Sequence, residues 1–376
     1  MSRIFLIGDS HVGLGYPNSV DKWFKIHEQY FSQFLLPLLK KEVREDDIII
    51  HLGDFFDNRN ILPINILNFG MKVIEDISKI APLHILVGNH DCWHKSSSEI
   101  NTLRPFKYIP NVQIYEETTK VDFNGKKLLL MPFLEKKRDQ IKFINENKDC
   151  HFLFCHSDLN GAKMHLTSVA HKNNDKIDVE EFNNFIKVYS GHIHIRQNNK
   201  NFTFVGSTFE MDRNDLGNQK GIYILDTNDN SEEFIANDIS PKFKKVWVKN
   251  EEDILTLDTI STKDFIDLKI SNSLLINNRK FRRKLEMILE TGNFASVEYL
   301  DDILTESVDI KTVVDEVTED ELRSGTVPSI QLEFKDVIKE YIDNQKYSSD
   351  KIKSGILTEF EKIIDVYNEN FKGIEN

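Results

Sequence analysis

The chain has 376 residues, 40% of them hydrophobic, which predicts a catalytic domain with its own core and a smaller second domain. Acidic side chains outnumber basic ones by 61 to 48, and the formal net charge of −13 argues against a protein that coats nucleic acid through its overall field. A local basic groove or a metal-held phosphate substrate is compatible with that charge.

Three cysteines, Cys92, Cys150 and Cys155, lack the paired spacing of a disulfide framework or a zinc knuckle, which favours a reducing compartment. The first residues run straight into a short apolar stretch without the features of a signal peptide. No segment approaches the ~18 apolar residues that a membrane span requires. We therefore expect a soluble, cytoplasmic protein with no membrane contact.

Residues 1–240 show the sequence pattern of a layered α/β domain, in which short β-rich runs alternate with turns or helical stretches. The predicted strands cover residues 4–7, 48–52, 83–87, 127–131, 152–155, 188–190, 202–205, 221–225 and 233–236. Helical patterns cover residues 21–41 and 62–79. Asn124 and Gly125 mark a tight hairpin turn before the strand at 127–131. A domain boundary is expected near Ser240 and Pro241.

Residues 241–305 predict a compact α+β unit, with strands at 244–249, 265–271 and 296–300 and a helix at 281–290. Residues 306–376 predict a linker and a polar helical tail, interrupted around Gly325 and Pro328. One apolar stripe in that tail contains Ile356, Phe360, Ile363, Ile364 and Tyr367 at helical spacing. The stripe packs either on a partner protein or on this chain, and the sequence leaves both readings open.

Five short polar motifs fall at or just after predicted strand ends. They are Asp9-Ser10-His11, Gly53-Asp54, Gly88-Asn89-His90-Asp91, His156, and Gly191-His192-Ile193-His194. Ligands of open α/β sheets collect beyond the carboxyl ends of the strands, so these motifs are expected to converge in one crevice. Each motif alone is more often a solvated loop or a core histidine, but five in this order are far more specific.

The residue types of these motifs suit a metal site. Carboxylate, imidazole and amide donors without cysteine fit Mn²⁺, Fe²⁺ or Zn²⁺ and argue against a structural zinc site. Asp9 with His11, and His192 with His194, are two positions apart, which on extended backbone points both side chains the same way. Each pair is therefore expected to grip one ion. The glycines before Asp54, Asn89 and His192 would let the backbone turn sharply beside the metal.

With these motifs, residues 1–225 resemble the calcineurin-like metallophosphoesterase superfamily. The resemblance implies a four-layer β-sandwich flanked by helices and a centre of two divalent ions, with Mn²⁺ the expected metal. It assigns Asp9, His11, Asp54 and His194 to one ion and Asp54, Asn89, His156 and His192 to the other. His90 would act as general acid or as a cation on the phosphate. Asp91 would orient His90, or instead cap a following helix.

Within the superfamily the chain is most similar to SbcD-type DNA repair and recombination nucleases, through its length, its domain order and the segment Gly53-Asp54-Phe55-Phe56-Asp57. That resemblance implies an exonuclease and endonuclease subunit acting on DNA ends, in a bacterial cell or a phage-infected host. Residues 241–305 would be its capping domain. The helices of 306–376 would bind the coiled-coil base of an SMC-like ABC ATPase, and the chain would form a homodimer.

Evidence for DNA from the residues themselves is limited to basic clusters. Lysines and arginines gather at 136–138, at 242–245, and in a run of five, Arg279, Lys280, Arg282, Arg283 and Lys284, which is the preferred DNA contact. The alternative for each cluster is a solvated face. Asp57-Asn58-Arg59 resembles a phosphate-binding pair of protein phosphatases, but Asn58 displaces the arginine. A phosphoesterase for cyclic nucleotides or phosphoproteins, and a non-cutting scaffold, are the alternative functions.

Overall fold

The computed structural model describes residues 2–15, 20–94, 96–166, 168, 173, 175–250, 252–253, 264–271, 274, 279–291 and 294–300. The chain divides into two compact units, Met1–Leu304 and Thr305–Asn376, and all described residues belong to the first. The predicted linker, tail helices and apolar stripe lie outside the described residues. Within the described part of the chain, no helix is long and apolar enough to cross a lipid bilayer.

The first of two large sheets has six strands in the order β14-β13-β1-β2-β3-β6. Its strands are β1 (Arg3–Ile7), β2 (Ile48–His51), β3 (Leu83–Leu86), β6 (Val112–Tyr115), β13 (Gly221–Asp226) and β14 (Glu232–Ala236). Strands β1, β2, β3 and β6 run parallel, whereas β13 is antiparallel to β1 and β14 to β13. The parallel strands therefore bring their carboxyl ends to one edge of the sheet.

The second sheet has the order β11-β12-β10-β9-β8-β7. Its strands are β7 (Thr119–Phe123), β8 (Lys126–Met131), β9 (Phe152–Cys155), β10 (Lys187–Ser190), β11 (Gln197–Asn199) and β12 (Phe202–Phe204). Strands β8, β9, β10 and β12 are parallel. The expected hairpin turn joins β7 to β8, and Asn124 and Gly125 both have positive φ, 51° and 79°, as a two-residue turn of this kind requires.

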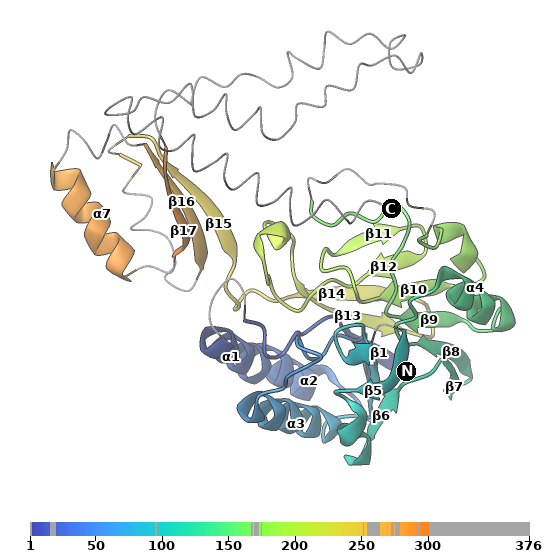
Figure 1. The fold of residues 1–376 in the computed structure, drawn as a ribbon. Helices are drawn as coiled ribbons and strands as arrows, with labels where there is room; N and C mark the ends of the chain where they lie inside the picture. The colour runs from blue at the N-terminus through green and yellow to red at the C-terminus, as the bar shows by residue number, and fades with distance from the viewer. Residues whose placement is uncertain are drawn as a thin grey trace, which may run out of the picture. The chain divides into compact units, whose positions relative to one another are not determined.

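The two sheets face each other and are covered on their outer sides by helices (Figure 1). The helices are α1 (Val20–Gln29), a π-helical segment (Tyr30–Leu35), α2 (Leu36–Glu42), α3 (Ile64–Ser78) and α4 (Lys137–Glu146). Alternate residues of each strand fill different layers, because successive side chains of a strand point to opposite faces. Ile4 and Leu6 pack between the sheets, whereas Phe5 and Ile7 pack with α1 to α3.

On the other side of the second sheet, Leu153 and Cys155 of β9 pack with Ile144 of α4 in a third core. Helix, sheet, sheet and helix thus make four layers, which confirms the expected α/β fold class. The predicted strands agree with the observed ones to within two residues. The single helix expected over 21–41 is instead interrupted by the π-helical segment between α1 and α2, a wider turn that shifts the buried face.

A smaller sheet follows the two large sheets along the chain. It has the parallel strands β15 (Phe243–Val248), β16 (Phe265–Ser271) and β17 (Phe294–Leu300), together with the helix α7 (Arg279–Thr291). Phe281 and Leu285 of α7 pack on one face of this sheet, against Val248 and Leu268. At its start, Phe265 joins the main core, with its ring 5.0 Å from that of Trp23.

The sequence did not indicate a short hairpin of β4 (Cys92–His94) and β5 (Ser97–Asn101), which follows directly after the Asn89 motif. It also did not indicate α4, β6 or β11. These elements are short or polar, so their hydrophobic pattern is too weak to identify them.

Candidate metal centre

The loops that follow β1, β2 and β10 carry histidine and aspartate in left-handed backbone conformations. The φ angles of His11, Asp54 and His192 are 44°, 52° and 78°. Residues other than glycine rarely adopt such backbone angles. Each residue in this conformation costs of order 1 kcal/mol or more, so the surrounding structure must impose it. The expectation that the ligand pairs lie on extended backbone is therefore wrong, and sharp turns bring these side chains together.

Glycines make the close approach of these loops sterically feasible. A Cβ added at Gly88 would lie 2.2 Å from Asp54 Oδ1, and one at Gly191 would lie 2.5 Å from Asp9 Oδ1. Real Cβ atoms never come so close to another heavy atom. Glycine at these two positions therefore lets the loops pass close together, whereas the sharp turn expected of the glycines is seen at Gly53, whose φ is 103°.

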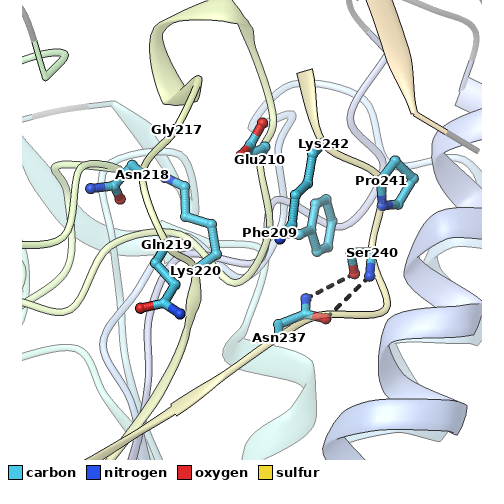
Figure 2. Close-up of a pocket in the computed structure, with 10 residues that line it drawn as sticks. All are labelled: Phe209, Glu210, Gly217, Asn218, Gln219, Lys220, Asn237, Ser240, Pro241 and Lys242. Atoms are coloured by element: carbon cyan, nitrogen blue, oxygen red, sulfur yellow. Dashed lines mark hydrogen bonds between the residues drawn. The ribbon is translucent and has the colours of Figure 1, made fainter. Parts of the chain in front are cut away.

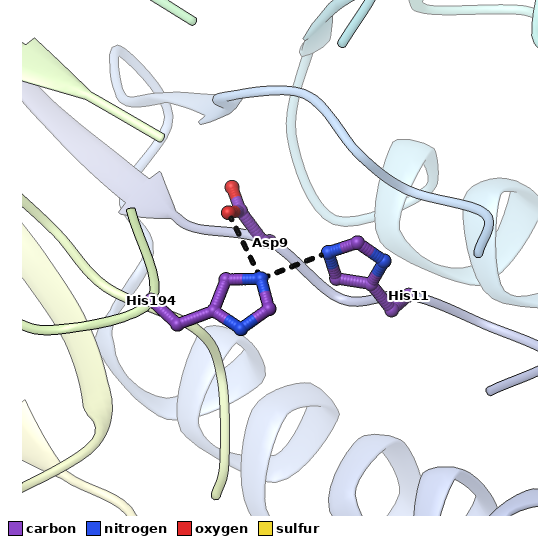
Figure 3. Close-up of side chains that lie close together, drawn as sticks. All are labelled: Asp9, His11 and His194. Carbon is purple, nitrogen blue, oxygen red and sulfur yellow. Dashed lines mark hydrogen bonds and ion pairs between the residues drawn. The ribbon is translucent and has the colours of Figure 1, made fainter. Parts of the chain in front are cut away.

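Asp9, His11 and His194 form the first group of ligand atoms, all within 4.8 Å of one another (Figure 3). His194 Nε2 lies 3.1 Å from His11 Nε2 and 3.7 Å from Asp9 Oδ2. Two ring nitrogens and a carboxylate oxygen therefore face one point.

Asp54, His156 and His192 form the second group, with Asn89 among them. Asn89 Oδ1 lies 3.0 Å from His156 Nε2 and 2.7 Å from His192 Nδ1. His156 Nδ1 donates to the carbonyl oxygen of Leu52 at 2.8 Å, which leaves Nε2 as the nitrogen that faces the group.

Asp54 is a member of the second group and also lies close to His11 of the first. Its Oδ2 lies 3.3 Å from His156 Nε2 and 3.8 Å from His11 Nε2, whereas its Oδ1 accepts a hydrogen bond from the backbone N–H of His90 at 2.7 Å. One carboxylate oxygen thus lies near a histidine of each group, and the other oxygen is held by the main chain. Asp54 would therefore be within reach of an ion held by either group.

His192 and His194 separate into different groups, although each pair of neighbouring motif residues was expected to hold one ion. Asp9 and His11 do share a group. The difference follows from the backbone, because the left-handed turn at His192 rotates its side chain away from that of His194.

The electrostatics of the buried groups favour bound cations. Burial raises the pKa of Asp9 to about 6. Burial lowers the pKa of His156, but Asp54 and Asp9 together raise it to about 9. Asp9 Oδ2 is buried and has no hydrogen-bond partner among the described residues. Two buried carboxylates that draw protons onto their histidine neighbours, one with an orphaned oxygen, fit divalent cations.

Asp57 orients His11 and was not identified as a site residue from the sequence. Its Oδ1 accepts a hydrogen bond from His11 Nδ1 at 3.1 Å, which turns His11 Nε2 toward the first group. A carboxylate behind a metal-ligating histidine fixes its tautomer and raises its basicity. From the sequence, Asp57 was considered only as part of the segment that resembles SbcD-type nucleases and of the comparison with protein phosphatases.

His90 lies at the edge of the first group, with its ring centroid 4.7 Å from that of His11. Its Nδ1 donates to the carbonyl oxygen of Asp57 at 2.8 Å. Burial and the neighbouring His11 lower the pKa of His90. Because Nδ1 is committed to the main chain, Nε2 is the nitrogen left to exchange a proton with a substrate.

Asp91 ties its own loop to the loop after β2 and takes neither of its expected roles. Its buried carboxylate accepts from the backbone N–H groups of Phe55, Phe56 and Gly88, at 3.3, 3.1 and 3.0 Å. The orienting contact to His90 comes from Asp57 instead. The strand β4, not a helix, begins at the next residue, so there is no helix terminus for Asp91 to cap.

Buried residues on the far side of the ligand loops hold the main chain in place. Lys220 Nζ donates to the carbonyl oxygen of His194 and to Asp215 Oδ1, both at 2.5 Å. His27 Nε2 lies 2.9 Å from the carbonyl oxygen of Ser10. A cavity of about 250 Å³, lined by Lys220 and Glu210 among others, opens beside this support (Figure 2).

The five basic residues predicted to contact DNA lie on α7 or at its start, outside both ligand groups. Arg279, Arg282 and Arg283 are exposed and Lys284 is partly buried, while the side chain of Lys280 is not described. Their contact with DNA stays a prediction.

The sequence comparisons with known families and proteins indicate one family of enzymes. The family model described as calcineurin-like phosphoesterase matches residues 2–196. The chain is 26% identical over 240 residues to "Exonuclease subunit 1" of Enterobacteria phage T4, covering 62% of this chain and 68% of that protein. It is 26% identical over 216 residues to "Putative phosphoesterase 244L" of Invertebrate iridescent virus 6, covering 55% and 70%. A solved archaeal phosphodiesterase aligns with a TM-score of 0.34 at 14% identity, covering 62% of this chain and 99% of that one.

Proposed function

The chain belongs to the calcineurin-like phosphoesterase family of metal-dependent phosphoesterases, and from that membership we propose that it is a nuclease subunit that hydrolyses phosphodiester bonds at DNA ends. One observation carries the catalytic part of the proposal. Seven side chains from five loops, spread over positions 9 to 194, gather in two adjacent groups, and one oxygen of Asp54 lies 3.3 Å from His156 Nε2 and 3.8 Å from His11 Nε2. Buried carboxylates and imidazoles gathered in this way support bound cations.

Each group would hold one divalent ion. The first would use Asp9, His11, Asp54 and His194, and the second Asp54, Asn89, His156 and His192. Two adjacent ions activate water and stabilise the attacking and leaving oxygens of an in-line displacement at phosphorus. We propose Mn²⁺ as the metal, because mixed oxygen and imidazole donors without thiolates suit it.

His90 would act on the leaving oxygen. The carbonyl of Asp57 holds His90 Nδ1, so a protonated Nε2 can donate to the oxygen that departs from phosphorus, or place a cation on the phosphate. Asp57 would serve both histidines on this side, since its carboxylate fixes His11 and its carbonyl fixes His90.

The similarity to the T4 protein, named as an exonuclease subunit, supports a nucleic acid as the substrate and a role as a subunit, and we propose that the nucleic acid is DNA. From the resemblance of the sequence to SbcD-type nucleases we propose that residues 241–305 form a capping domain on a nuclease domain of residues 1–240. Helices within 306–376 would bind a coiled-coil SMC-like ABC ATPase, the chain would form a homodimer, and the basic run from Arg279 to Lys284 would contact DNA.

Linear DNA incubated with the purified chain and Mn²⁺, with and without the ATPase partner, tests this proposal. We expect degradation from the ends that is lost in Asp54→Asn. Turnover of cyclic nucleotides or phosphopeptides by the same preparation, without cleavage of DNA, would favour a small-substrate phosphoesterase instead.

A further inference from the structure

One face of the small sheet carries a tryptophan surrounded by lysines. Side chains alternate between the two faces of a strand, and Val246, Val248 and Leu268 point toward α7. The neighbours of these residues, including Lys245, Trp247 and Lys269, therefore lie on the opposite face. Trp247 and Lys269 are cross-strand partners, and Lys245 stands two residues before Trp247 on β15.

This face begins at the nuclease domain. Its first pair, Phe243 and Phe265, is buried in the main core. On the next pair, Arg213 Nε contacts both carboxylate oxygens of Asp267, at 2.7 and 2.9 Å. Trp247 follows one step farther along the sheet. A ligand lying along the face would thus be led to the nuclease domain.

Trp247 is 45% exposed, although it is a large aromatic residue in a sheet that buries its other face. The ammonium groups of Lys249 and Lys269 lie 5.0 and 5.6 Å from the centroid of its ring. Lys245 and Lys249 are exposed, and among the described residues neither has a carboxylate within ion-pair distance. We call Lys245, Trp247, Lys249 and Lys269 the Trp247 patch.

The charge distribution singles out this part of the chain. Residues 241–305 contain eleven basic and eleven acidic side chains, so the whole net charge of −13 lies elsewhere in the sequence. Several lysines of the small sheet are neutralised, for example Lys244 by Asp264 at 2.8 Å. The lysines of the Trp247 patch are gathered around an exposed aromatic ring, a combination that fits an anionic ligand with flat rings.

We propose that the Trp247 patch binds single-stranded nucleic acid, with a base stacked on Trp247 and backbone phosphates on the lysines. This inference rests on the proposed function for its substrate class and adds a binding site that α7 does not supply. A paired duplex hides the faces of its bases, so stacking on Trp247 requires an unpaired strand. An acidic protein segment would use the lysines but not the ring.

Fluorescence anisotropy of a labelled oligo-dT of about 16 nucleotides, titrated with the full chain in EDTA, tests the proposal without cleavage. Trp247→Ala is expected to weaken binding about tenfold, the effect of losing one stacked base. Trp247→Phe keeps an aromatic face and should bind nearly as the unmodified chain does. Lys245→Ala/Lys249→Ala should weaken binding and lower the slope of log K against log salt by about 2.

Lys142→Ala/Lys148→Ala removes two exposed charges from α4 or the turn after it and should leave the affinity unchanged, which controls for net charge. Unchanged binding in both Trp247→Ala and the Lys245/Lys249 variant would overturn the proposal. A loss of affinity in the Lys245/Lys249 variant alone, equal for duplex and single-stranded DNA, would also overturn it, because Trp247 would then contribute nothing to binding.

The two proposals can fail separately. Hydrolysis of bis(p-nitrophenyl) phosphate with Mn²⁺ reports on the metal centre and should be the same in the unmodified chain and in every variant of the Trp247 patch. If the unmodified chain does not hydrolyse it, the proposed function fails while the binding data still decide the patch. If hydrolysis is normal but oligo-dT binding ignores Trp247, only the patch is wrong.

Discussion

Asp57 Oδ1 lies 3.1 Å from His11 Nδ1, so a carboxylate three residues after Asp54 sets the direction in which His11 faces the site. This pair links the loop after β1 to the loop after β2. The same residue holds His90 through its carbonyl oxygen. A proposed metal ligand and the proposed acid thus both depend on Asp57, which is outside the two proposed ligand sets.

Asp57→Ala is expected to weaken Mn²⁺ binding by roughly 10- to 100-fold, because His11 loses the acceptor that fixes its tautomer. The Mn²⁺ affinity of Asp57→Asn, which keeps an oxygen acceptor but loses the charge, should lie between those of Asp57→Ala and the unmodified chain. Isothermal titration of the metal-free chain with MnCl₂ measures the effect. Equal affinity in all three proteins would show that Asp57 does not position His11.

His90→Ala should lower kcat for DNA cleavage by about 10²- to 10⁴-fold while leaving Mn²⁺ affinity unchanged, because the side chain of His90 is outside the two proposed ligand sets. The loss should be much smaller for bis(p-nitrophenyl) phosphate, whose leaving group departs without a proton. An equal loss on both substrates would indicate that His90 acts as a cation on the phosphate and not as the acid.

Lys220→Met is expected to destabilise the fold by about 3–5 kcal/mol, because it leaves the carboxylate of Asp215 buried without its cation. Lys220→Met/Asp215→Asn should recover part of that loss. Lys72→Met, which breaks the exposed pair of Lys72 with Asp76, should change stability by no more than about 1 kcal/mol. Urea unfolding of the four proteins measures these differences, and a Lys220→Met loss as small as that of Lys72→Met would contradict the prediction.

Glu210 gives stability a pH dependence of predictable sign. Burial raises the pKa of Glu210 from its ordinary value of 4.5 to about 7, despite the hydrogen bond that its carboxylate accepts from the backbone N–H of Phe243. Between these values the unfolded chain releases the proton while the folded chain keeps it, so this group costs stability as pH rises from about 4.5 to 7.

Glu210→Gln should therefore be close to the unmodified chain in stability at pH 4.5 and more stable above pH 7, by on the order of 1–3 kcal/mol. Thermal unfolding across this range measures the difference. If the stability gained by Glu210→Gln decreased as pH rises, the prediction would be contradicted.

The layers and the ligand loops could be predicted from the sequence because they depend on strong local patterns. Apolar runs such as 48–52 have no other plausible place than a buried strand, and polar residues at the carboxyl ends of parallel strands must share one edge. Asn124 and Gly125 predicted their turn because few other residues tolerate positive φ at both positions.

Other features depend on three-dimensional neighbours. The left-handed conformation of His11 follows from the packing of its loop against the loop after β2, where the carbonyl of Asp54 accepts the N–H of His11. Asp91 bonds to backbone groups about 35 positions away, which no spacing rule indicates. The Trp247 patch required the register of β15 and β16, since Lys269 is 22 positions from Trp247.

The account depends on two cations sharing Asp54, and electron paramagnetic resonance of the chain titrated with Mn²⁺ tests that directly. We expect two ions per chain with a spectrum showing magnetic coupling between them, and in Asp54→Asn the loss of that coupling together with weaker binding. A folded chain that binds fewer than two ions at saturating Mn²⁺, or binds two that are uncoupled, would contradict the shared centre.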